Sequence, residues 1–172
     1  MKILLAALSC SLALAQTMTI EEYQPKSTLV VPQHPVSRAR YPFIDVHNHQ
    51  ARCLKPECVD KLVADMDALN LRVMVNLSGG YGDSLKRAVE AQHGRFKDRL
   101  IVFANIDFRN LDDPDYPARA AAQLEQDVKN GAQGLKIFKN FGMDLKDSKG
   151  RVHVDDPRFD QIFERVESRI ID

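Results

Sequence analysis

Four short apolar runs, rich in β-branched residues, recur along the chain at nearly regular intervals. They begin at residues 43, 71, 100 and 134, so that successive starts lie 28, 29 and 34 residues apart. The runs read FIDVH, LRVMVNL, LIVFANI and GLKIF. Apolar runs of this length and composition predict β-strands. The spacing is typical of βα units, which take about 30 residues each, and it constrains the fold more than any other feature.

Amphipathic stretches fill the intervals between the predicted strands. Apolar side chains recur there at the spacing of a helix with one buried face. The predicted helices cover Pro56–Leu69, Asp83–Gln92 and Pro117–Lys129, and a fourth starts near Pro157. Asn130 and Gly131, which follow the third helix, are typical of a helix end before a strand. The chain therefore repeats a strand and a helix four times.

Strands joined through helices run in parallel, and parallel sheets are buried on both faces. This leaves an open doubly wound sheet or a (β/α) barrel. A nucleotide-binding open sheet has a glycine-rich turn after its first strand, whereas the corresponding segment here, HNHQARC, has no glycine. The sequence therefore predicts an α/β fold of the TIM (β/α)8-type barrel. Eight strands need about 250 residues, so the chain is expected to hold only the first four βα units, a half barrel.

The two ends of the chain predict three segments. MKILLAALSCSLALAQ has a basic start, an apolar run and small residues before Gln16, which is the pattern of a cleaved signal peptide over residues 1–15. Residues 16–42 are polar and interrupted by prolines, and we expect an N-terminal arm there. The regular domain then covers residues 43–172. A signal peptide implies an exported protein, either periplasmic or secreted.

Charge and hydropathy exclude two classes of partner. Lysine plus arginine and aspartate plus glutamate number 24 each, so no net field favours nucleic acid. The apolar run near the N-terminus is shorter than the roughly 20 residues that span a bilayer, and no membrane span is expected. Cys53 and Cys58 remain after signal removal, and they form either a disulfide or two free thiols.

Two histidines stand at the end of the first predicted strand, in FIDVHNHQ. Residues i and i+2 of a strand share a face, so His47 and His49 would present both imidazoles on one side, with backbones about 6 to 7 Å apart. We predict that they bind a divalent metal, with zinc as the expected ion. Asp45 lies one strand period earlier. It either accepts an imidazole proton as an outer partner of the metal or satisfies backbone donors.

Polar residues also follow the second and third predicted strands. They are Asn76 and Ser78, then Asn105 and Asp107. In a parallel fold such residues can line a pocket with the histidines or serve the loops alone. The remaining histidines lie away from strand ends and are left out of the metal site.

The chain resembles the amidohydrolase superfamily, in its amidohydrolase-related branch of metal-dependent TIM-barrel enzymes. The resemblance rests on FIDVHNHQ and on GAQGLKIFKNFGM, residues 131–143, and it covers roughly Tyr41 to Phe163. It implies a metal-dependent hydrolase in which a metal-bound water attacks a small carbonyl substrate, or a related nonhydrolytic decarboxylation. It also makes Lys136 a candidate, since a lysine of the fourth strand bridges two metals in several branches. Contact with an anionic substrate group, or simple exposure to solvent, are the alternatives for Lys136.

The resemblance also implies what the chain lacks. The family completes its metal site with a histidine after the fifth strand and an aspartate after the eighth, and we expect a truncated copy without them. Two imidazoles leave a tetrahedral zinc two protein ligands short. A noncatalytic remnant or binding module, and a metal-dependent phosphoesterase or nuclease, therefore stay open as alternatives. Unpaired edges of a half barrel would favour association of copies, so a homo-oligomer is expected as a further possibility.

Overall fold

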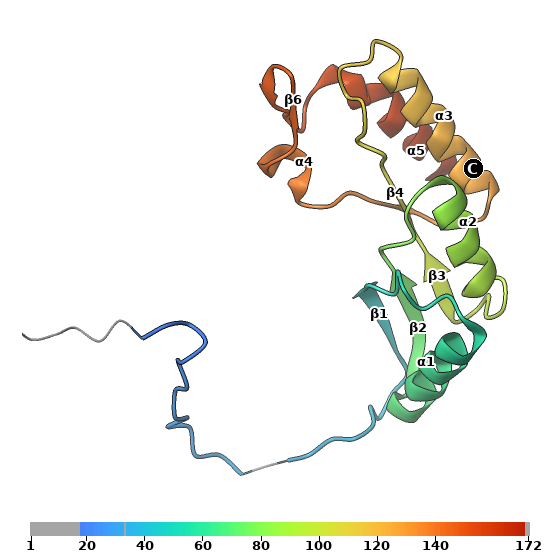
Figure 1. Cartoon of the computed structure of the whole chain (residues 1–172). Helices are drawn as coiled ribbons and strands as arrows, with labels where there is room; N and C mark the ends of the chain where they lie inside the picture. Colours follow the sequence, from blue (N-terminus) through green and yellow to red (C-terminus); the bar gives the residue numbers. More distant parts are fainter. Residues whose placement is uncertain (1–17, 33, 171–172) are drawn as a thin grey trace, which may run out of the picture. The chain divides into compact units, whose positions relative to one another are not determined.

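The computed structural model describes residues 18–32 and 34–170 (Figure 1). The chain divides into two units, residues 1–35 and residues 36–172. The described residues of the first unit form no helix or strand and are exposed. The predicted signal peptide lies outside the described residues. Within the part of the chain that the structure describes, no helix has the length and apolar character needed to cross a bilayer.

The second unit contains all the described helices and strands. The strands are β1 (Phe43–Asn48), β2 (Leu71–Asn76), β3 (Leu100–Val102), β4 (Ala104–Asn105), β5 (Leu135–Lys136), β6 (Lys146–Asp147) and β7 (Gly150–Arg151). The helices are α1 (Pro56–Leu69), α2 (Gly82–Ala91), α3 (Tyr116–Lys129), the short α4 (Asn140–Met143), the 3-10 turn η1 (Pro157–Phe159) and α5 (Asp160–Ile170). The first three predicted helices are confirmed to within one residue at each end. The fourth, expected to start near Pro157, begins there as the 3-10 turn η1 and continues as α5.

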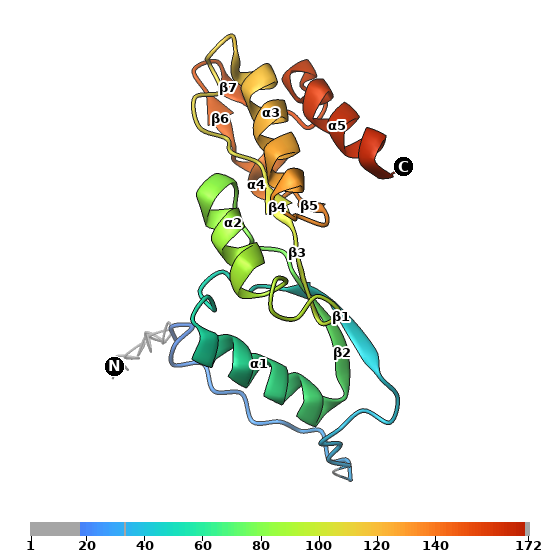
Figure 2. The ribbon, with the colours of Figure 1, turned by 90° about the vertical axis from the view of Figure 1, so that its right-hand side faces the viewer.

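The first three predicted strands pair in parallel in the order β1-β2-β3. Helix α1 lies along this sheet (Figure 2). Its buried residues Val59, Val63 and Met66 pack in one apolar cluster with side chains from β2 and β3. Helix α1 begins with proline in its first turn and ends at Asn70, which has φ 67°. Asparagine tolerates this left-handed conformation better than most residues, so the sequence sets the point where the chain turns into β2.

The prediction of a half barrel is wrong. The run that starts at residue 100 is divided at Phe103, and β5 pairs with β4 over only two residues. The described strands thus form a three-stranded sheet, a separate two-stranded sheet and the antiparallel β6–β7 pair, and not one wall of four strands. The ring of Phe103 lies where a Cβ at Gly134 would stand. The regular pairing of the fourth run covers only Leu135 and Lys136, opposite Ala104 and Asn105.

A larger apolar cluster lies among the helices that follow the sheet. Helix α3 packs against α2 on one side and against α5 on the other (Figures 1 and 2). The centre of this apolar cluster is aromatic, since Phe159 contacts the rings of Tyr116, Phe141 and Phe163. Burying such side chains contributes about 1.5 to 3 kcal/mol each. This cluster gives the fold a core that does not depend on the outer strand β1.

Strand β1 is the outer strand of its sheet, and its apolar side chains are uncovered. Ile44 is 58% exposed and Val46 is 68% exposed. On the neighbouring strand, Leu71, Met74 and Val75 are buried. Strand β1 therefore contributes little to the apolar cores of the described residues and is held by its pairing with β2.

Candidate functional site

The two histidines of FIDVHNHQ present their rings to each other. The ring centroids of His47 and His49 are 5.3 Å apart and the ring planes make an angle of 66°. Both side chains are exposed. Two imidazoles that share a tetrahedral zinc, with Zn–N bonds of about 2.0 to 2.1 Å, have their centroids about 5 Å apart. The spacing of these two rings therefore fits one shared ion.

Strand β1 has a bulge between Asp45 and Asn48, the interval that contains His47. Asp45 lies opposite Met74 and Asn48 lies opposite Asn76, so β1 has one residue more than β2 in this interval. A bulge of this kind changes the direction in which nearby side chains point and is frequent beside functional sites. The regular alternation that predicted a common face for His47 and His49 is therefore locally broken, and yet the rings lie close together.

Two side chains from later segments hold the ring of His49. Its Nδ1 lies 2.7 Å from the Oγ of Ser78, which follows β2. The ring of Phe138 stacks on it with a centroid distance of 6.0 Å. Because Nδ1 is engaged, Nε2 is the nitrogen left for a ligand. Metal-binding histidines usually have their second ring nitrogen bonded in this way.

Asp45 bonds to the main chain and to an amide, and not to an imidazole. Its Oδ1 accepts the backbone N–H of His47 at 3.0 Å, and its Oδ2 accepts from Nδ2 of Asn48 at 2.7 Å. These bonds span the bulge. Of the two roles considered from the sequence, the arrangement shows the one in which the carboxylate satisfies nearby donors.

Lys136 lies in β5, two residues before Phe138. Its backbone oxygen accepts a hydrogen bond from Nδ2 of Asn105 at 3.1 Å, and its side chain is half-buried. No ion pair or hydrogen bond of its amine is found among the described residues. The segment that carries Lys136 thus reaches the histidine pair through Phe138, while the lysine itself makes no contact that would assign it to the metal.

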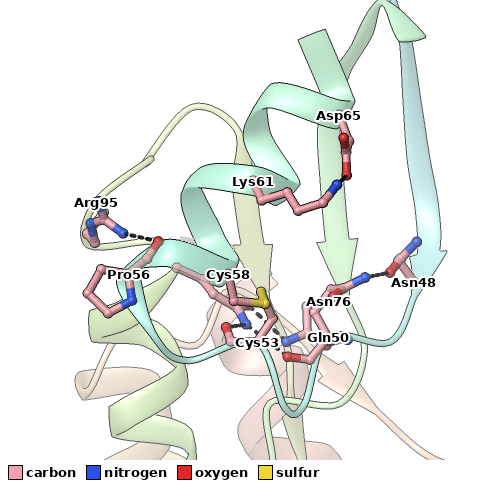
Figure 3. Close-up of a disulfide and its surroundings, with 10 residues drawn as sticks. Asn48, Gln50, Cys53, Pro56, Cys58, Lys61, Asp65, Asn76 and Arg95 are labelled. Atoms are coloured by element: carbon pink, nitrogen blue, oxygen red, sulfur yellow. Dashed lines mark hydrogen bonds and ion pairs between the residues drawn. A yellow bond between two sulfur atoms is a disulfide. The ribbon is translucent and has the colours of Figure 1, made fainter. Parts of the chain in front are cut away.

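The loop after His49 is tied to the end of β2 and closed by a disulfide. The backbone N–H of Gln50 donates to Oδ1 of Asn76 at 2.9 Å, and Nε2 of Gln50 donates to Oδ1 of Asn48 at 2.7 Å (Figure 3). Cys53 and Cys58 form a disulfide, with Cα atoms 5.4 Å apart. Of the two states considered for these cysteines, the structure has the bonded one. The segment that follows the histidines is thereby anchored at both its ends.

A second group of charged side chains lies beyond β4, away from the histidines. Asp107 accepts a bidentate bond from Arg109, whose guanidinium also lies over the ring of Tyr81. The Arg109 bonds hold the pKa of Asp107 below its usual value. Asp107, Arg109, Tyr116 and Arg119 line a cleft of about 490 Å³. The sequence left open whether Asp107 lines a pocket with the histidines or serves its loop alone. No contact between Asp107 and the histidines is found in the described part of the chain.

The ligand set around the histidines is small. Among residues 18–32 and 34–170, no three side chains of histidine, cysteine, aspartate or glutamate are grouped so that they could hold a metal ion. His47 and His49 are therefore two nitrogen ligands at a water-exposed strand end, which leaves coordination positions for water or a substrate oxygen. Such an arrangement can bind a divalent metal weakly and keep it open to solvent.

Sequence reasoning found the histidines but not their surroundings. It singled out Ser78 only as one of several polar residues at strand ends, and it gave no role to Phe138. The contact of Phe138 depends on where the segment after β5 returns to the sheet, which no local pattern encodes.

No family model, no curated protein and no solved structure matches the chain.

Proposed function

We propose that the chain is a metal-dependent hydrolase of the amidohydrolase type, exported from the cytoplasm, that acts on a small carbonyl substrate. The observation that carries the proposal is the 5.3 Å separation of the His47 and His49 ring centroids at a water-exposed strand end. Zinc is the expected ion, because imidazole nitrogen is a preferred zinc ligand.

The roles of the residues follow from their contacts. His47 and His49 supply two nitrogen ligands, and Nε2 of His49 is the free nitrogen because Nδ1 is bonded to Ser78. The ring of Phe138 restricts the rotation of His49 and gives an apolar wall beside it. A bound zinc would lower the pKa of a water molecule to about 7 and polarise a carbonyl oxygen. Exposure of both histidines leaves a small substrate free to approach.

A binding function without turnover is the second candidate. It is favoured by the small ligand set, since the described residues offer no third histidine, cysteine or carboxylate at the pair. A catalytic zinc has three protein ligands in well-characterised enzymes. The two candidates differ in turnover and agree in metal binding.

The test combines zinc affinity with turnover of a small activated ester, p-nitrophenyl acetate. We expect the full chain to bind one zinc ion and to hydrolyse the ester faster with zinc than without it. His47→Ala should lose both properties. His153→Ala is the matched control, since His153 is also exposed and no contact between it and the pair is found among the described residues. No zinc uptake would reject the metal site, and zinc uptake without added turnover would favour the binding function.

A further inference from the structure

We infer that Asn76 and Gln92 are positioning residues that hold the histidine pair through one buried amide network. The inference rests on the proposed metal site, and it assigns the role to two side chains that do not touch a metal. Asn76 is 2% exposed and Gln92 is 1% exposed. They stand at the end of β2 and just after α2, and they are joined by a bond of 2.9 Å from Nδ2 of Asn76 to Oε1 of Gln92.

The network is hydrogen-bonded to the backbone of Gln50, directly after His49. The N–H of Gln50 donates to Oδ1 of Asn76 at 2.9 Å. The C=O of Gln50 accepts from Nε2 of Gln92 at 3.0 Å. Both main-chain polar groups of Gln50 are thereby bonded to buried side chains, so the direction in which the chain leaves His49 is fixed from two sides.

The same oxygen of Asn76 also holds the residue that contacts the His49 ring. The N–H of Ser78 donates to Oδ1 of Asn76 at 2.9 Å, and Oγ of Ser78 lies 2.7 Å from Nδ1 of His49. Oδ1 of Asn76 therefore holds both the backbone that follows His49 and Ser78, the residue that contacts the His49 ring. Loss of the network would release both at once.

The chemistry of the network allows one orientation of the amides. Nε2 of Gln92 faces two carbonyl oxygens, those of Gln50 and Cys53, each at 3.0 Å. An amide nitrogen must occupy that place, because an oxygen there would face two acceptors. Oε1 of Gln92 then faces Asn76, which must donate with Nδ2 and keep Oδ1 for its two N–H partners. Every bond agrees with this assignment, so the network specifies a single geometry.

The network also reaches the disulfide loop. The carbonyl of Cys53 is one of the two acceptors of Gln92. Figure 3 shows Gln50 and Asn76 beside the Cys53–Cys58 bond. The backbone carbonyls of Gln50 and Cys53 are therefore both hydrogen-bonded to Gln92, just after α2. The disulfide links the same segment to the first turn of α1.

The test replaces Gln92 by methionine, which has a similar length and no amide. We expect the zinc Kd of Gln92→Met to rise about tenfold or more, the range found when outer partners of metal ligands are removed. In the metal-free protein, the Gln50 amide should exchange its hydrogen at least about tenfold faster, because its bonded partner is loosened. The imidazole 15N shifts of His49 should also change, because the Ser78 hydroxyl that contacts Nδ1 of the ring is no longer held in place.

Asp127→Ala is the matched control. Asp127 is 1% exposed and accepts from the N–H of Gly82 and from Gln123, so its loss also removes buried hydrogen bonds. It should lower the thermal midpoint and leave the zinc Kd, the Gln50 exchange and the His49 ring shifts as in the wild type. A purely structural network would make Gln92→Met behave in the same way as Asp127→Ala, and that result would overturn the inference.

Two measurements keep the inference open to rejection in every case. Should Gln92→Met fail to fold, the wild-type Gln50 amide decides: slow exchange supports the network, and exchange at the rate of an unprotected amide overturns it. Should the wild type take up no zinc, the proposed function fails, while the Gln50 exchange and the His49 ring shifts of the metal-free protein still judge the network. The failures of the two proposals are thus distinguishable.

Discussion

Strands β1 and β2 are neighbours of equal length, and they have opposite environments. The apolar side chains Ile44 and Val46 of β1 are mostly exposed, whereas Leu71 and Met74 of β2 are buried under α1. The histidines stand at the end of the exposed strand, and the buried strand ends in Asn76. Strand β1, FIDVHN, has three apolar residues and β2, LRVMVN, has four, so composition alone does not explain the difference.

The comparison separates two ways of ordering a strand end. Strand β2 is ordered by burial against α1 and by pairing with strands on both sides. The end of β1 is ordered by hydrogen bonds, through Asp45, Asn76 and the loop after His49. A site built in this way keeps its ligands open to solvent, because the groups that hold them lie behind the exposed strand. The predictions below test this division between burial and hydrogen bonding.

The largest effect is expected for a truncation on the buried strand. Met74→Ala should lower the free energy of unfolding by about 2 to 5 kcal/mol, because it removes buried apolar atoms and leaves a cavity. Val46→Ala on β1 should change it by about 0.5 kcal/mol or less, since the side chain is mostly exposed. Chemical denaturation of both variants measures the difference. A cost for Val46→Ala equal to that for Met74→Ala would abolish the contrast between the strands.

Removal of the disulfide should have the next largest effect. Cys58→Ser should lower the free energy of unfolding by about 2 kcal/mol, because the cross-link restricts a short loop of the unfolded chain. Cys58 itself is exposed, and the buried Cys53 stays in place. Urea unfolding of Cys58→Ser against the oxidised wild type gives the value. An unchanged midpoint would mean that the hydrogen bonds alone hold the loop.

A smaller effect on stability and a specific effect on metal binding are expected at Ser78. Ser78→Ala removes the hydroxyl that contacts Nδ1 of His49. The zinc Kd should rise about tenfold, which corresponds to about 1.4 kcal/mol of binding free energy. Competition with a chromophoric chelator measures it. Equal affinity in wild type and Ser78→Ala would show that the hydroxyl does not orient the ligand.

The smallest effect concerns a buried polar group far from the histidines. Oδ2 of Asp127 has no hydrogen-bond partner among the residues that the structure describes, and burial raises the pKa of this carboxyl. A carboxyl whose pKa is raised in the folded state stabilises the fold fully at pH values below its unfolded pKa, near 3.8. This stabilisation is lost as the pH rises through the folded pKa. Asp127→Asn should therefore be more stable than the wild type at about pH 7, by about 1 kcal/mol or less, with no such gain at about pH 3.

Denaturation curves at the two pH values test the Asp127 prediction. A loss of stability on Asp127→Asn at neutral pH would contradict it. The result would show how the Asp127 carboxyl and the Asn76–Gln92 amide pair differ in their effect on stability. Ionised Asp127 destabilises the helical core, whereas the amide oxygen and the amide nitrogen of both Asn76 and Gln92 have hydrogen-bond partners.

The sequence predicted the elements of the fold well and their assembly poorly. The helical spacing of apolar residues gave the limits of α1, and Asn130 with Gly131 gave the end of α3. The third run is divided at Phe103, and the ring of Phe103 lies against Gly134, 31 residues further along the chain. Periodicity carries no information on such contacts, so the barrel prediction failed there.

The candidate site was predicted in part. The spacing of His47 and His49 drew attention to the pair, and the strand-end position of Asn76 and Ser78 drew attention to those residues. The bulge in β1, the stacking of Phe138 and the role of Gln92 were not foreseen. Gln92 stands just after a helix, where sequence patterns predict solvent exposure, and only the assembled structure buries it.

The most direct test of the account is a zinc titration of the full chain followed by the 15N signals of its imidazole rings. Convergence of the two rings on one ion predicts that the His47 and His49 signals shift together and saturate at one zinc per chain, while His153 stays unchanged. Signals of His47 and His49 that shift independently, or that do not respond to zinc, would contradict the shared site.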